Sequence, residues 1–592
     1  MPLRVTGAEG GEGVSHDMVI RGGFVVDGTR SVGRTADVAI DDGIVTAVGQ
    51  IGGRGIRELD ADGLLVTPGF VDVHSHYDGQ ATWDPVLAPS AWHGVTTTVM
   101  GNCGVGFAPV APDRHEWLIG LMEGVEDIPG AALSVGIDWQ WETFPDFLDH
   151  LATKQWTMDV GTQVPHGAVR AYVMGERGAR NQPATPADIE AMAAIVAEGL
   201  DAGALGFSTS RTLAHRAVDG EPVPGTFAAN DELFGIGLAL AEAGFGVFEL
   251  AAAGALGEDV AAPPKEMEWM RRLAAEIGRP VLFGLTQNNS APDQWAEMLE
   301  LLAEARAGGS NVIGQVHPRT VSILQGLQTF HPFMFTPAWG ELGMGFRSLP
   351  EQVAAMGTPE VRARMLVEIE QSDDPVVRGL LTPDLTFVLG DPPNYTPGYE
   401  DSIAGIAELE GRTAWEVLYD RLIEGDGGEL LNTPVLNYSQ KSLEPAREML
   451  ESPYTAFGLG DGGAHASQTC DASVTTWMLS YWARDRGEDR FPVEHSVAMM
   501  TSETADLYGL RDRGRLIPGM AGDVNLIDLE SLALTRPHLE WDLPGGAKRL
   551  IQEADGYVAT VKRGTVTFEN GEWTGETPGS LLKGPQAASA AA

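Results

Sequence analysis

The 592-residue sequence predicts an α/β fold in which a closed (β/α)8 barrel carries a small β domain assembled from both ends of the chain. Three observations support this fold. Short apolar runs alternate with turns and helical patterns through the middle of the chain, as in βαβ units. Eight such runs favour a closed barrel over an open sheet. β-rich segments without helical patterns flank the middle on both sides.

Composition limits the partners that the protein can have. A net charge of −44 makes nucleic acid and anionic membranes unfavourable partners. The N-terminus shows no apolar signal region, and the most membrane-like stretch, 238–256, is interrupted by Glu242 and Glu249. The two cysteines, Cys103 and Cys470, are too few for a disulfide framework. We therefore expect a cytoplasmic protein acting on a small molecule, and a large barrel of this kind favours a homo-oligomer.

The β domain is expected to contain residues 17–67 and 511–575. The predicted strands before the barrel are Met18–Val26 and Ala36–Val48, and those after it are Asp523–Asp528, Tyr557–Val561 and Thr565–Phe568. Residues 576–592, ending in PQAASAAA, are predicted to be a disordered tail.

The barrel is expected to span residues 68–510. Its predicted strands, in order, are Phe70–Val73, Val95–Met100, Gly161–Pro165, Ala204–Ser208, Phe245–Leu250, Val281–Thr286, Asn311–Val316 and Ala456–Gly460. Clear helical patterns lie between several of them, such as Pro186–Ala202 and Glu266–Ile277. A long insertion at about 325–450, with a strand at Thr382–Gly390 and a helix at Ala414–Gly425, interrupts the alternation. It could be a substrate-binding lid or an oligomer contact.

Side chains that can bind a metal follow the first and last predicted barrel strands. His74 and His76 are two residues apart at the end of a strand, so their imidazoles point to the same side. Barrel closure brings Asp461, just past the last strand, beside them. One more histidine or cysteine would complete a zinc site with an open position for water, and Asp461 could then serve as general base. The pair could instead be hydrogen-bonded strand-end histidines.

Other strand ends supply further candidates. The second carries Cys103 and the third runs into His166; a cysteine nucleophile with His166 as base would leave the histidine pair and Asp461 unexplained. Arg211 and Arg319 could each hold a substrate carboxylate, or form structural ion pairs with the many acids. His215 and His465 are further candidates for substrate binding, and Trp83 could line an acyl pocket or pack within its loop.

Four segments together resemble the amidohydrolase superfamily, specifically its D-aminoacylase (N-acyl-D-amino-acid deacylase) branch: GFVDVHSHYDGQATWDP, GVTTTVMGNCGVGFAPV, GALGFSTSR and GDGGAH. The likeness extends from about Met18 to Thr574 and includes IPGMAGDVNLIDL. It implies a distorted (β/α)8 barrel with a small β-sandwich built from both termini, and cleavage of an amide bond by metal-activated water.

Carried over residue by residue, the resemblance implies metal ligation by His74, His76 and Cys103 and an acid–base role for Asp461. In this branch the cysteine replaces a carboxylated lysine, and none of the six lysines here ends a predicted barrel strand. Cys103 could otherwise be a small buried residue in a turn. The histidines expected after strands five and six are missing, so Glu249, Gln287 and His317 are candidates as substitute ligands or substrate contacts. We therefore expect one divalent ion, Zn²⁺, in preference to two.

Three functions are compatible with the sequence. The first is hydrolysis of a linear amide, such as an N-acyl-D-amino acid. The second is hydrolysis of a cyclic amide, imide or lactam. The third is a binding or scaffolding role for a barrel that has lost its tighter metal.

Overall fold

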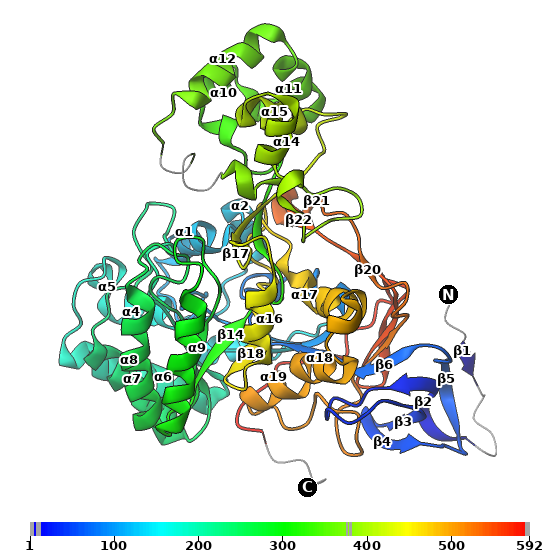
Figure 1. Ribbon diagram of the computed structural model, residues 1–592. Coiled ribbons are helices and arrows are strands. Elements are labelled where there is room, and N and C mark those ends of the chain that lie inside the picture. Colours follow the sequence, from blue (N-terminus) through cyan, green and yellow to red (C-terminus); the bar gives the residue numbers. More distant parts are fainter. Residues whose placement is uncertain (1–4, 8–13, 375–376, 378–381, 587–592) are drawn as a thin grey trace.

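The computed structural model describes residues 5–7, 14–374, 377 and 382–586 (Figure 1). Its barrel contains all eight predicted strands, the third of which is divided into two short pieces. The barrel strands are β7 (Phe70–Asp72), β8 (Val95–Met100), β9 (Asp159–Thr162), β10 (Val164–Pro165), β11 (Gly206–Ser210), β12 (Val247–Ala251), β13 (Val281–Gly284), β14 (Val312–Val316) and β18 (Thr455–Phe457). Nearly all of their residues are buried, as expected where helices cover a parallel sheet.

The barrel is distorted at two positions. Strands β7, β8 and β9 form one parallel sheet, and β10, β11, β12, β13, β14 and β18 form another. The chain connects the sheets through Gln163, between β9 and β10. Strands β7 and β18 do not form a regular ladder with each other. The ring is closed just beyond them, where the Asp461 N–H donates to the His74 carbonyl (3.0 Å) and the His76 N–H donates to the Gly462 carbonyl (2.8 Å). The ends of β7 and β18 therefore meet, as predicted from closure.

Helices surround the barrel on its outer side (Figure 1). Threonine caps and an early proline start α3 and α6, because the hydroxyl accepts from a free N–H of the first turn. The helices are α1 (His115–Glu126), α2 (Gly130–Gly136), α3 (Phe144–Leu151), α4 (His166–Met174), α5 (Glu176–Ala179), α6 (Pro186–Ala202), α7 (Asn230–Ala243), α8 (Ala262–Ile277), α9 (Gln294–Ala307), α16 (Glu444–Glu451), α17 (Val474–Trp477), α18 (Val493–Met500) and α19 (Ser502–Leu507). A π-helical segment, Met478–Asp485, continues α17.

The β domain joins the two ends of the chain in one sheet with its own apolar core, as predicted. The junction is the antiparallel pair of β6 and β19. Its strands are β1 (Val5–Gly7), β2 (Val14–Val25), β3 (Arg34–Asp41), β4 (Ile44–Gly49), β5 (Arg54–Asp60), β6 (Leu65–Pro68), β19 (Val524–Ile527), β24 (Tyr557–Lys562), β25 (Thr565–Glu569) and β26 (Glu572–Trp573). Buried Asp159 of β9 pairs with Lys562 (2.7 Å) and Arg513 (2.6 Å) and so ties the barrel to this domain.

One part of the C-terminal segment leaves the β domain. Strands β21 (His538–Leu543) and β22 (Ala547–Ile551) form a separate hairpin, and β20 (Ala533–Leu534) pairs with β23 (Ala554–Asp555) at its base. Figure 1 shows the hairpin (orange) on the side of the barrel that faces the insertion, far from the blue strands. The prediction that all of 511–575 belongs to the β-sandwich therefore needs correction.

The insertion has its own core and small sheet. Its strands are β15 (Val321–Gln325), β16 (Phe387–Val388) and β17 (Leu431–Leu436), and its helices are α10 (Pro337–Glu341), α11 (Leu349–Met356), α12 (Pro359–Glu370), α14 (Ile403–Glu410) and α15 (Ala414–Leu422). These helices stand above the barrel in Figure 1. The insertion ends earlier than predicted, because α16 packs on β14 and β18 as a barrel helix.

The start of the predicted disordered tail is ordered. Gly579 and Leu581 form bridges with Trp156 and Val160, and Leu582 is buried in the apolar cluster at the base of the barrel. The expectation of disorder is wrong for residues 576–586, because Leu582 fills that base, Leu581 packs against the main core, and the backbone pairs with β9. Residues 587–592 lie outside the described part. Among the described helices, none has the length and apolar character to cross a membrane.

Candidate metal centre and active site

Four potential ligand atoms converge where β7 and β18 end. The His74 Nε2 atom lies 3.4 Å from the Cys103 Sγ atom and 3.3 Å from Asp461 Oδ1. Asp461 Oδ1 is also 3.8 Å from His76 Nε2. Ligands about 2.0–2.3 Å from one tetrahedral ion are separated by about 3.3–3.8 Å, so these spacings fit a single transition-metal cation. The two histidines and the cysteine are buried.

The opposite ring nitrogen of each histidine faces an acceptor. His74 Nδ1 lies 3.0 Å from Gln315 Oε1, and His76 Nδ1 lies 3.5 Å from Glu126 Oε1. The Gln315 bond fixes the tautomer of His74 and directs its Nε2 towards a metal, whereas Glu126 faces His76 Nδ1 without a hydrogen bond in this structure. Burial and the nearby His74 lower the pKa of His76 well below its usual range, so this imidazole is neutral and able to ligate.

Glu126 is a site residue that the sequence reading missed. It ends α1, whose buried face includes Leu118, Met122 and Glu126 itself at helical spacing. Its second carboxylate oxygen lies 3.9 Å from His465 Nε2, and its carbonyl accepts the His465 N–H. In the sequence, Glu126 could have been noticed as an acid on the apolar face of a predicted helix, because a charged residue buried there needs a partner.

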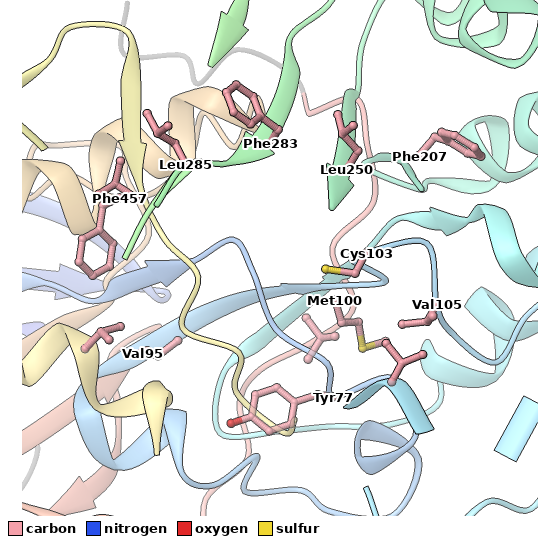
Figure 2. Packing of buried hydrophobic residues seen from close by; sticks show 14 of the residues in the cluster. Tyr77, Val95, Met100, Cys103, Val105, Phe207, Leu250, Phe283, Leu285 and Phe457 are labelled. Carbon is pink, nitrogen blue, oxygen red and sulfur yellow. The ribbon is translucent and has the colours of Figure 1, made fainter. Parts of the chain in front are cut away.

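Cys103 sits in a turn that directs its sulfur inward. Its φ of +54° is unusual for a residue with a side chain, and its N–H donates to Glu249 Oε2 (2.8 Å). Figure 2 shows the sulfur pointing away from Val105, towards the inside of the barrel. Glu249 of β12 therefore holds the cysteine turn in place, and its other oxygen lies 4.0 Å from His74 Nδ1.

Acidic groups are concentrated in this buried volume. Burial first, and then the charge of Glu249, raise the pKa of the Cys103 thiol well above its usual range. Burial likewise raises the pKa of Glu126 strongly and that of Glu249 to about 7. A bound cation would offset this accumulation and favour the thiolate and carboxylate forms. The donor set therefore fits a divalent metal on chemical as well as geometric grounds.

The loop after β18 holds further strained residues. Asp461 and His465 have φ values of +45° and +51°. Non-glycine residues in this region cost about 1–3 kcal/mol each and cluster at functional sites. His215, predicted as a substrate contact, is half-buried with Nδ1 3.2 Å from Ser210 Oγ. Burial, followed by the nearby His465 and His74, lowers the pKa of His215 to about 3. Both predicted histidines thus lie near the ligand atoms.

Four other predicted site residues are engaged elsewhere. Arg211 pairs with Glu266 (3.2 Å) and two backbone carbonyls. Buried Arg319 bonds Asp471 (3.1 Å) and Ser473 and lies over the Tyr395 ring.

Gln287 donates to the Pro292 carbonyl and accepts from the Ser439 N–H, while His317 Nδ1 bonds the Arg319 carbonyl. For the two arginines the geometry favours structural ion pairs, and Gln287 and His317 connect the barrel rim to neighbouring loops. His166 is likewise engaged, with Glu232 and Thr209.

A small cavity lies beside Asp461. Its walls come from the loop after β7, the region around α2, the loop that follows Asp461, and the β21–β22 hairpin. Trp83 and Leu133 form part of its apolar lining, and Arg549 and Asp471 contribute charged groups.

Comparisons with known proteins agree with this geometry. The family model described as the amidohydrolase family matches residues 57–568. An uncharacterized protein of Mycobacterium tuberculosis is 26% identical over 95% of this chain and 94% of its own length. D-aminoacylase of Alcaligenes xylosoxydans xylosoxydans is 31% identical over 33% of this chain and 37% of its own, and the N-acyl-D-aspartate deacylase of that organism is 34% identical over 33% and 36%.

Two solved structures share the fold. A crystal structure of D-aminoacylase aligns with a TM-score of 0.64 at 23% identity, over 96% of this chain and 100% of that one. N-acyl-D-glutamate deacylase of Bordetella bronchiseptica, solved with zinc and a phosphonate inhibitor, aligns with a TM-score of 0.62 at 22% identity, over 96% and 99%. The chain belongs to the amidohydrolase family, and its class of activity is hydrolysis of a C–N bond.

Proposed function

We propose that this chain is a deacylase that hydrolyses the amide bond of N-acyl-D-amino acids or related N-acylated compounds with one divalent ion, zinc. The observation that carries the proposal is the convergence of His74, His76, Cys103 and Asp461 beside a cavity. The partial similarity to D-aminoacylase and N-acyl-D-aspartate deacylase supports the substrate class.

The ligand set favours one cation. His74 Nε2, His76 Nε2 and Cys103 Sγ would hold it, with Asp461 Oδ1 adjacent. A divalent cation there supplies a Lewis acid that polarises the amide carbonyl and acidifies water. D-aminoacylase itself has a binuclear centre and is described as activated by one metal and attenuated by the second. Glu249 bonds the Cys103 N–H, which supports a role in holding the cysteine rather than a second ion.

Asp461 is the proposed proton-transfer group. Its side chain is 19% exposed, whereas those of His74 and His76 are almost fully buried, and it also lines the cavity. It would take a proton from the attacking water as the new C–O bond forms. It would return that proton to the amide nitrogen as the C–N bond breaks, which balances the hydrolysis. Gln315 and Glu126 would keep the two imidazoles oriented during both steps.

A substrate panel with defined metal content tests the proposal. Protein stripped of metal and reloaded with zinc, cobalt or manganese would be assayed on N-acyl-D- and N-acyl-L-amino acids and on cyclic imides and lactams. We expect hydrolysis of the N-acyl-D compounds only after reloading. Turnover confined to cyclic amides would overturn the substrate class. Substoichiometric metal with no amide hydrolysis under any condition would instead support a binding protein.

A further inference from the structure

The β21–β22 hairpin is attached directly to the candidate site. The Leu550 N–H donates to the Ala466 carbonyl (2.6 Å), in the loop that follows Asp461. The neighbouring Lys548 donates to the Gln328 carbonyl, at the start of the insertion. The hairpin turn, Pro544–Gly546, packs against α2. A segment that follows the barrel in sequence is therefore fixed over the cavity beside Asp461.

This hairpin brings a cation to the cavity. Arg549 lines the same cavity as Asp461, and its side chain is 9% exposed. Its Nε and Nη2 atoms donate to the Asp542 carboxylate (2.9 and 2.5 Å), and Nη1 donates to the Ala88 carbonyl (2.7 Å). A guanidinium carries five N–H donors, so these bonds leave one donor on each Nη atom. Arg549 is thus held firmly and can still bind an acceptor.

The remaining charges around the cavity are already compensated or belong to the reaction centre. Among the described residues that line it, Arg549 is the only arginine or lysine. Asp471 is neutralised by Arg319 at 3.1 Å, beneath the lining. Asp542, the partner of Arg549, is 41% exposed, so water can solvate this carboxylate if the ion pair rearranges. A carboxylate entering the cavity would meet Arg549, which is already paired with Asp542, and would share or displace that partner.

We propose that Arg549 anchors the carboxylate of the substrate and that the β21–β22 hairpin is the element that selects it. The inference rests on the proposed deacylase function and assigns one of its specificity determinants. The guanidinium pairs with the carboxylate through its spare N–H groups, while Trp83, Leu133 and Leu550 contact the hydrocarbon part. Selection then depends on a charge-assisted hydrogen bond that a neutral amide cannot form equally well.

The test compares an N-acyl-D-amino acid with its carboxamide, in which the carboxylate is replaced by CONH₂. The zinc-loaded wild type should prefer the acid. Arg549→Met should lower kcat/KM for the acid by about 10–100-fold, mainly through KM, because a charge-assisted bond is lost. It should leave the carboxamide nearly unchanged. Melting temperature and metal content of each variant report whether the fold and the metal centre persist.

Two further variants keep the test decisive if Arg549→Met does not fold. Arg549→Lys retains the charge without the planar fork, and we expect a smaller, acid-selective loss. Asp542→Asn removes the competing carboxylate, and we expect acid turnover to be equal or faster. Equal losses for acid and carboxamide, or a wild type with no preference for the acid, would overturn the anchor alone. A wild type inactive on both compounds would overturn the deacylase function as well.

Discussion

The two halves of the barrel rim use their polar side chains in different ways. At the ends of β7, β8 and β18, the side chains of His74, His76, Cys103 and Asp461 point at one another. Within or just after β12, β13 and β14, the polar side chains support that group or hold neighbouring loops. A polar residue at a strand end is thus only a candidate; the atoms that it faces decide whether it can ligate.

Replacement of Asp461 by Asn should produce the largest loss of activity among variants of the ligating half, the part of the rim that carries His74, His76, Cys103 and Asp461. Because the amide cannot act as general base, hydrolysis should fall by about 10²–10⁴-fold. The fold and most of the metal should remain, since the two histidines and Cys103 persist. Steady-state kinetics with metal analysis measures both quantities. Normal turnover by Asp461→Asn would show that another group is the base.

Removal of the acceptors that face the two histidines should lower metal affinity, although neither acceptor is itself a proposed ligand. Glu126→Ala and Gln315→Ala each remove the acceptor that faces an Nδ1 atom, and we expect metal affinity to fall by about 10–100-fold. Chelator competition measures this loss. Glu126→Gln is the matched control, because its amide oxygen can still accept, and it should lose less. Unchanged affinity in the alanine variants would mean that the imidazoles need no support.

Glu249→Gln separates a supporting role from ligation. Glutamine retains an oxygen that can accept the Cys103 N–H, so metal content should stay unchanged and activity should fall less than in the preceding variants. Atomic absorption on protein dialysed against each metal gives the stoichiometry. A drop from two ions to one per chain would identify Glu249 as a ligand of a second cation, and β12 would then also supply a metal ligand.

Gln287→Ala should affect stability alone. Gln287 is fully buried and bonds the Pro292 carbonyl and the Ser439 N–H, so its loss leaves these groups unpaired. We expect the free energy of unfolding to fall by about 1–3 kcal/mol. Metal affinity should match the wild type. Chemical denaturation together with chelator competition would detect a departure from either expectation.

Much of the fold could be read from the sequence because it rests on local patterns. The eight barrel strands are short apolar runs, and closure alone placed Asp461 beside His74 and His76. The hairpin carrying Arg549 could not be found in this way. Its strands look like the β-domain strands around them, and only tertiary contacts bring them over the cavity.

The supporting residues were also invisible to strand-end reasoning. Glu126 lies on a helix, and Gln315 is an inward-facing residue within β14 rather than after it. Conversely, Arg211 and Arg319 follow strands as a substrate clamp would, yet each pairs with a buried acid. The sequence shows that acids are present but not how close they lie to Arg211 and Arg319. Only the three-dimensional structure could therefore distinguish a substrate clamp from an ion pair.

The most direct test of the account is metal stoichiometry in a matched pair of variants. Cys103→Ala removes a residue of the ligating half, and His317→Ala removes a histidine that faces Asp471 and a backbone carbonyl instead. We predict about one divalent ion per chain in the wild type and in His317→Ala, and a large loss of bound metal in Cys103→Ala. Retention of metal by Cys103→Ala, or its loss from His317→Ala, would contradict the account.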